Sequence, residues 1–111
     1  RILLTFGTSS KRLLTYAPEI AVIDSTTELE SAVHAADRRG LAVVITYCGR
    51  NLALREPDRP ADGDLVRALD SGAHGFVRTG VVQGMEELFS YHVFRREPGK
   101  SDTRLNKTGA N

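Results

Sequence analysis

Two short runs of apolar, mostly β-branched residues constrain the fold of this chain more than any other feature. Residues 20–23 read IAVI and residues 41–46 read LAVVIT, and neither run alternates between apolar and polar positions. Strands covered by helices on both faces show this pattern, whereas a strand with one face in water alternates. We therefore expect both runs to be central strands of a parallel sheet.

The segment between these runs predicts an α-helix. Ser25 and Glu28 have the spacing of a capping box, in which each side chain accepts a hydrogen bond from the other residue's backbone N–H. Apolar residues then recur at helical spacing, and Gly40 follows as a stop signal. Strand, helix and strand in this order predict a right-handed crossover between parallel strands.

The rest of the chain predicts further strands and helices. Their expected positions are a strand at 1–6, a helix at 9–16, an exposed loop at 55–63, a helix at 64–71 and a strand at 75–78. A last helix is predicted because one face at helical spacing carries Met85, Leu88, Phe89, His92 and Val93. After this helix, apolar residues no longer recur at a regular spacing.

This order of elements predicts an α/β fold with a parallel sheet of four or five strands flanked by helices. The type is flavodoxin-like or CheY-like, with sites at the carboxyl ends of the strands. We expect one domain over residues 1–95, followed by a polar tail or linker at 96–111.

Charge and composition exclude several partners. Fifteen Lys and Arg stand against fourteen Asp and Glu, a net charge of +1, so we expect no direct nucleic-acid binding by this domain. No apolar run is long enough for a bilayer, and we expect no membrane contact and a cytoplasmic location. Cys48 is the single cysteine and the three histidines are scattered, so we expect no metal and no other cofactor.

Residues 68–80, ALDSGAHGFVRTG, resemble the stretch around the fourth helix and fifth strand of response-regulator receiver domains. Upstream, residues 18–24 (PEIAVID) are similar to the family's third strand, which ends in the phospho-accepting aspartate. The resemblance implies two-component signal transduction, with Asp24 as acceptor, Thr46 as switch hydroxyl, and Thr79 and Gly80 beside the site.

Three departures from the family pattern argue against standard phosphorylation. The acidic pair expected after the first strand is missing, so Mg²⁺ would lack most of its carboxylate ligands. The expected lysine falls at Thr79, and no Met-Pro turn follows Asp24. In an alternative register, residues 20–23 are the second strand and Thr46 stands at the acceptor position, which leaves no aspartate to phosphorylate.

The sequence therefore favours a regulatory receiver-like module that works without phosphorylation, through a protein partner, self-association as a dimer or a small ligand. It would be no enzyme, and it would belong to a regulator such as a transcription regulator. One alternative is an ordinary receiver phosphorylated at Asp24 with Mg²⁺, whose acidic pair lies upstream of Arg1. The other is a fragment of an α/β enzyme that binds phosphate through residues 72–80.

Structural roles are the simpler interpretation of the single residues. Asp24 is placed to cap the helix that follows it, and Thr46 suits a β-branched strand end. Cys48 predicts a small, partly buried thiol, and Gly72 predicts a helix stop. His92 is interpreted as a boundary residue of the last helix.

Overall fold

The computed structural model describes residues 1–53, 56–83 and 89–101, which form an α/β fold around a five-stranded mixed sheet of order β2-β1-β3-β5-β4. The strands are β1 (Ile2–Phe6), β2 (Ala21–Val22), β3 (Val43–Arg50), β4 (Val77–Gln83) and β5 (Phe89–Arg96). The helices are α1 (Ser10–Tyr16), α2 (Thr26–Arg38), α3 (Pro60–Asp70) and the short 3₁₀ turn η1 (Ala73–Gly75). None of the described helices is long and apolar enough to cross a membrane.

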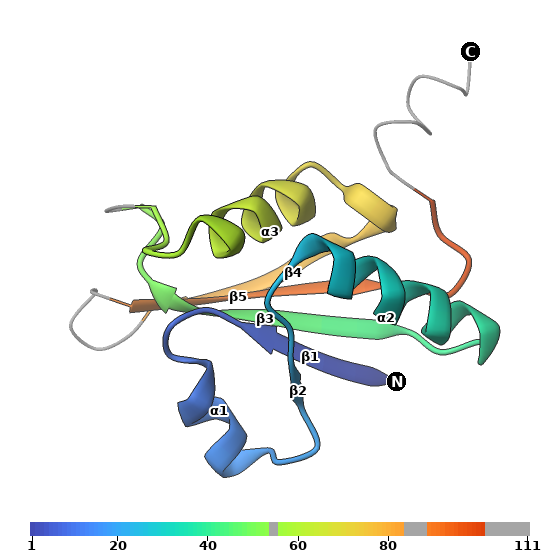
Figure 1. Cartoon of the computed structure of the whole chain (residues 1–111), viewed down its shortest axis with the longest axis horizontal. Coiled ribbons are helices and arrows are strands. Elements are labelled where there is room, and N and C mark those ends of the chain that lie inside the picture. Colours follow the sequence, from blue (N-terminus) through green and yellow to red (C-terminus); the bar gives the residue numbers. More distant parts are fainter. Residues whose placement is uncertain (54–55, 84–88, 102–111) are drawn as a thin grey trace.

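The helices cover the two faces of the sheet unequally. Figure 1 shows α2 and α3 on one face and α1 on the other, near β1 and β2. This follows from right-handed crossovers, because the chain moves from β1 to β2 in one direction and from β2 past β1 to β3 in the other. The main core lies under α2 and α3, where Leu29, Val33, Leu65 and Leu69 pack with Phe6, Ile45 and Phe94.

The prediction of a parallel, CheY-like sheet is wrong. β1 pairs in parallel with β2 and β3, but β5 lies antiparallel between β3 and β4. The β3–β5 pairing, from Val43↔Arg96 to Arg50↔Phe89, is the longest in the sheet. A receiver-type order would place β4 beside β3, whereas here β5 occupies that position.

The reason is that the predicted last helix is a strand. Met85 and Leu88 lie outside the described residues, but Phe89, His92 and Val93 all belong to β5. Burial along β5 alternates strictly, which is the period of a strand. β4 also continues through Gly80 to Gln83 instead of stopping near Arg78, and it pairs antiparallel with β5.

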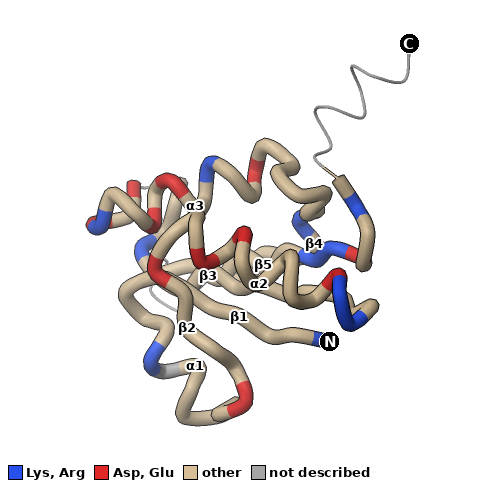
Figure 2. The backbone as a smooth tube through the Cα atoms, turned by 45° about the vertical axis from the view of Figure 1, so that its right-hand side comes forward, with Lys and Arg blue, Asp and Glu red and all other residues tan. Residues whose placement is uncertain are grey.

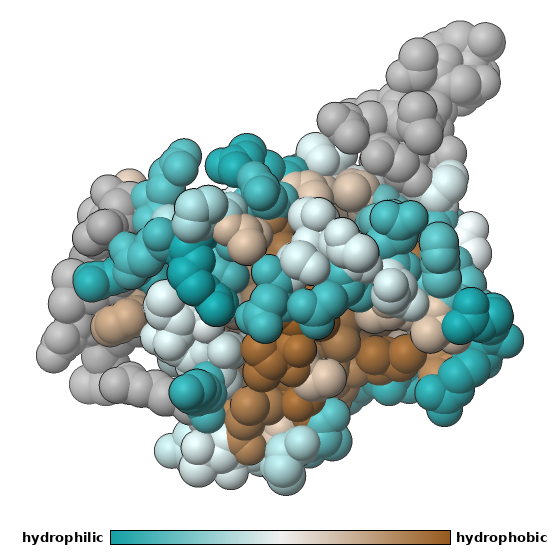
Figure 3. Space-filling view, viewed as in Figure 1, coloured by the Kyte–Doolittle hydropathy of each residue, from teal (hydrophilic) through white to brown (hydrophobic). Residues whose placement is uncertain are grey.

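The two apolar runs have different positions in the sheet. The central position predicted for residues 41–46 is confirmed, because β3 lies between β1 and β5, but β3 spans Val43–Arg50 and is parallel only to β1. The prediction for residues 20–23 is wrong in position, because β2 is an edge strand of two residues and Val22 is 39% exposed. Figure 3 shows apolar side chains at the surface between α2 and α1, around β1 and β2.

The residues at which α2 and α3 begin are explained by a capping side chain and by a proline. Half of the capping box predicted for α2 is confirmed, since the Ser25 hydroxyl accepts a hydrogen bond from the N–H of Glu28 at 3.2 Å. The Glu28 carboxylate accepts from the N–H of Asp24 at 3.3 Å rather than from that of Ser25. Ser25, not Asp24, is the N-cap. α3 begins at Pro60 rather than at Asp64, because a proline in the first turn loses no helical hydrogen bond. The predicted loop at 55–63 therefore ends earlier than expected.

Arg96 connects the end of β5 to α2 by hydrogen bonds. This residue was assigned to the tail, but it is the last residue of β5 and its side chain is buried. Its guanidinium donates to Asp37 Oδ1 at 2.8 Å, to the carbonyl of His74 at 2.8 Å and to the carbonyl of Lys100 at 2.6 Å. These bonds join α2, η1 and the segment after β5. The hydrogen bond from Arg96, together with one from the N–H of Gly99, lowers the pKa of Asp37.

We predict that Phe94→Ala destabilises the domain by about 3–5 kcal/mol, because the ring is buried on β5 and its loss leaves a cavity. Val77→Thr, on the neighbouring strand, removes apolar surface from an exposed position and should change stability by less than about 0.5 kcal/mol. Urea unfolding of both variants measures the difference. Equal, small effects would contradict the burial of the β5 face.

Candidate functional site

The residues predicted from the receiver resemblance do not come together. Asp24 follows β2 at one edge of the sheet, whereas Thr79 and Gly80 lie on β4 at the opposite edge. Four strand spacings separate β2 from β4, roughly 19 Å. Asp24 is 65% exposed at its side chain and pairs with Arg59 at 3.5 Å. No common site is formed.

The threonines and the cysteine have contacts within the sheet. Thr46 lies inside β3 rather than at its end, and its carbonyl accepts the hydroxyl of Thr5 at 2.8 Å. Thr79 lies at an irregularity in β4 and donates to the carbonyl of Val93 at 3.3 Å. Cys48 is a free, fully buried thiol whose pKa is raised by burial, which agrees with the predicted structural role.

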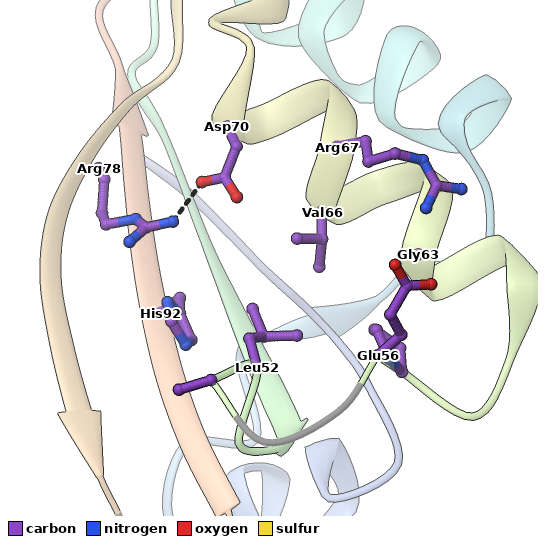
Figure 4. Close-up of a pocket in the computed structure, with 10 residues that line it drawn as sticks. Leu52, Glu56, Gly63, Val66, Arg67, Asp70, Arg78 and His92 are labelled. Atoms are coloured by element: carbon purple, nitrogen blue, oxygen red, sulfur yellow. Dashed lines mark hydrogen bonds and ion pairs between the residues drawn. The ribbon is translucent and has the colours of Figure 1, made fainter.

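The structure instead presents a cleft on the face covered by α3. Its volume is about 390 Å³, and its walls come from the segment after β3, from α3, from β4 and from β5 (Figure 4). We call it the α3–β5 cleft. It is lined by Leu52, Ala53, Glu56, Pro57, Gly63, Val66, Arg67, Asp70, Arg78 and His92.

His92 is the most buried titratable group of the α3–β5 cleft, with 7% of the residue exposed. The alternation of β5 turns it toward α3, on the same face as Ser90 and Phe94. Its Nε2 lies 2.9 Å from the hydroxyl oxygen of Ser90. The ring of Tyr47, on the neighbouring strand, is tilted against the imidazole with 5.8 Å between the ring centres.

A glycine makes this arrangement possible. Gly49 lies opposite Ser90 in the β3–β5 pairing, and a Cβ atom at Gly49 would come within 2.6 Å of the Tyr47 hydroxyl. With glycine there, Tyr47 folds over the strand and donates to the carbonyl of Arg50 at 2.8 Å. Burial raises the pKa of Tyr47 to about 12, so this phenol stays neutral beside His92.

The second ring nitrogen of His92 lacks a hydrogen bond. Nδ1 is closed to solvent and has no partner among the described residues. A buried polar atom left in this state costs about 1–3 kcal/mol, and such atoms are rare in folded proteins. Burial, with the nearby Arg78 guanidinium, lowers the pKa of His92, whereas Asp70 acts in the opposite direction. The imidazole is therefore neutral at pH 7.

Charged side chains surround the opening of the cleft in pairs. Arg78 donates to Asp70 and lies over the ring of Phe94 at 5.6 Å from the ring centre. Arg67 binds Asp64 at 2.6 Å, one helical turn away on α3. These pairs are largely exposed and contribute little to stability, but they give each arginine a carboxylate partner within the protein.

The contact between Ser90 and His92 is buried. The two side chains have the separation of a nucleophile and its base, but Ser90 is only 1% exposed and Nδ1 of His92 is closed to solvent. Among the residues that the structure describes, no group of three His, Cys, Asp or Glu side chains could hold a metal ion. What the cleft offers is an apolar wall and an unsatisfied imidazole nitrogen.

Sequence reasoning missed this site because it assigned His92 to a helix. The signal that could have found it is the alternation in FSYHVFRR, where Phe89, Tyr91 and Val93 occupy one face and His92 the other. The cleft also depends on Asp70, which belongs to another element, and no local pattern brings it to His92. Only the pairing of β5 with β3 and β4 does so.

The chain matches no known family model, no curated protein and no solved structure. The resemblance of residues 68–80 to receiver domains stays a prediction, although the sheet that the resemblance implied is corrected above.

We predict that the His92 ring titrates below about 6.5, the ordinary value for histidine. Because the fold favours the neutral ring, the unfolded chain takes up its proton first as the pH falls through about 6.5. Stability is then lost between that pH and the lower pKa of the folded protein. Proton NMR gives the pKa, and urea unfolding across this range gives the loss.

The groups that face the ring are Tyr47 on β3, Asp70 on α3 and Arg78 on β4. The variant Ser90→Ala/His92→Phe removes the titrating group together with its buried partner, and its stability should vary less over the same range. A His92 midpoint above about 6.5 would contradict the neutral ring.

Proposed function

We propose that this domain is a regulatory module that binds a small organic molecule in the α3–β5 cleft and acts without phosphorylation or catalysis. The observation that carries the proposal is the buried Nδ1 of His92, which lines a cleft and has no hydrogen-bond partner among the described residues. A ligand that bonds to this nitrogen removes an energetic cost that the free protein bears. That difference favours the bound state.

The shape of the α3–β5 cleft supports this proposal. Ligand sites are concave and mostly apolar, with a few polar groups that fix the orientation of the ligand. Leu52 and Val66 supply the apolar wall, and the polar part of the lining consists of His92 and four charged side chains. The volume of about 390 Å³ is in the lower part of the range for such sites.

Two alternatives from the sequence have less support. A phosphorylated receiver needs an acceptor that is held beside a metal and a fixed cation, but Asp24 is exposed and its neighbour Arg59 also pairs with the buried Asp62 at 2.8 Å. An enzyme that binds phosphate through residues 72–80 would need an anion site there. Gly72 instead ends α3, with φ of 83°, and its N–H donates to Leu69.

A cytoplasmic location belongs to the proposal, and the reduced thiol of Cys48 agrees with it. We also propose that nucleic acid is no direct partner. Figure 2 shows positively and negatively charged residues interspersed along the described backbone rather than gathered into one basic region. The predicted protein partner or second copy stays a prediction.

A screen of a small-molecule fragment library by ¹H–¹⁵N NMR tests the proposal. Binding at the α3–β5 cleft should shift the amides of Leu52, Gly63 and Val66, which lie on two of its walls. Amides on the opposite side of the sheet, such as that of Leu14 in α1, serve as the control. Hits that cluster elsewhere, or no hits at all, would contradict the assigned site.

A second arm tests the phosphorylated alternative. With acetyl phosphate and Mg²⁺ we expect no gain of a phosphate by mass spectrometry, because the described residues provide no metal-binding group of carboxylates. A phosphate that appears in the wild type and is lost in Asp24→Asn would decide for the receiver function.

A further inference from the structure

We infer that the ligand of the α3–β5 cleft is an uncharged molecule that carries a hydroxyl group on an apolar body, with the hydroxyl bound to Nδ1 of His92. This inference rests on the proposed function and adds the chemical class of the ligand. Three features of the cleft carry it: the balance of its charges, the state of its histidine and the nature of its walls.

The charges of the cleft disfavour an ionic ligand. Its lining contains two cations, Arg67 and Arg78, and two carboxylates, Glu56 and Asp70. Both cations are already paired with carboxylates on α3. An anion would have to compete with those carboxylates, and a cation would meet the two arginines. An uncharged molecule brings no charge that would have to be paired inside the cleft.

The histidine favours a hydroxyl group. A neutral imidazole has one N–H donor and one lone-pair acceptor, and the contact of Nε2 with Ser90 fits either tautomer. Nδ1 is therefore an acceptor in one tautomer and a donor in the other. A hydroxyl can donate and accept, so it satisfies Nδ1 in both cases, whereas a carbonyl or an ether fits only one.

The walls favour an apolar body. Leu52 comes from the segment after β3, and Val66 faces it from α3 (Figure 4). Pro57 also lines the cleft. Contact with these side chains gains about 25 cal/mol for each Å² of apolar surface removed from water. Because Nδ1 is closed to solvent, the hydroxyl can bond to it only when the side chains around the imidazole move aside.

Four probes with one aromatic ring test the chemical class. Phenol is uncharged and carries the hydroxyl, and toluene has nearly the same shape without it. Benzoate and benzylamine supply the negative and the positive charge. Titrations followed at the amides of Leu52, Gly63 and Val66 give the four dissociation constants. We expect phenol to bind about tenfold more tightly than toluene, the effect of one hydrogen bond, and both ions to bind more weakly than phenol.

Matched variants assign the preference to the histidine. Ser90→Ala/His92→Phe keeps an aromatic ring of similar size and removes both polar partners, so the ratio of phenol to toluene affinity should fall to about one. Tyr91→Phe removes a hydroxyl from the opposite face of the same strand and should leave that ratio unchanged. Circular dichroism shows whether each variant is folded. A ratio that stays near ten in the folded double variant would overturn the role of His92.

The possible results distinguish a failure of the inferred ligand class from a failure of the proposed function. Equal binding of phenol and toluene to the wild type, or tighter binding of an ion in the cleft, would overturn the ligand class while leaving a ligand site. If none of the four probes shifts an amide of the cleft, the ligand class is overturned. If the fragment library also gives no hit there, the proposed function is overturned with it.

Discussion

The antiparallel pairing of β5 with β3 is the constraint on which the rest of the structure depends. It turns Ser90, His92, Phe94 and Arg96 toward α2 and α3, the only face of the sheet with two described helices. Three of these four side chains are polar, so the centre of the sheet contributes hydrogen-bonding groups to the core. Whether the hydrogen bonds of these side chains are all formed decides which part of β5 is structural and which part forms a site.

Arg96 and His92 illustrate the two outcomes. The Arg96 guanidinium is buried, but its donors reach Asp37 and two backbone carbonyls, so the charge stabilises the junction of α2 with the end of β5. His92 has a partner only at Nε2, within the described part of the chain, and its Nδ1 remains unsatisfied. A fully bonded group holds the fold together, whereas a half-bonded group beside a cleft is available to a ligand.

Much of the first half of the fold was predictable because its signals are local. The capping residues of α2 and the unbroken apolar run of β3 each indicate one structure. β5 was not predictable in the same way, since Phe89, His92 and Val93 fit a helical face while Phe89, Tyr91 and Val93 fit a strand. The helical spacing that begins at Met85 and Leu88 favoured the helix, and the cleft was missed because contacts between distant residues form it.

The most direct test of the account is the ¹⁵N chemical shift of the two imidazole nitrogens of His92 at pH 7, measured without ligand and with phenol. The account predicts a neutral ring in the free protein. With phenol it predicts a clear change at Nδ1, where a hydrogen bond forms, and a smaller change at Nε2, which keeps its contact with Ser90. A protonated ring in the free protein, or an Nδ1 shift that phenol leaves unchanged, would contradict the central claim that His92 is the recognition group of this domain.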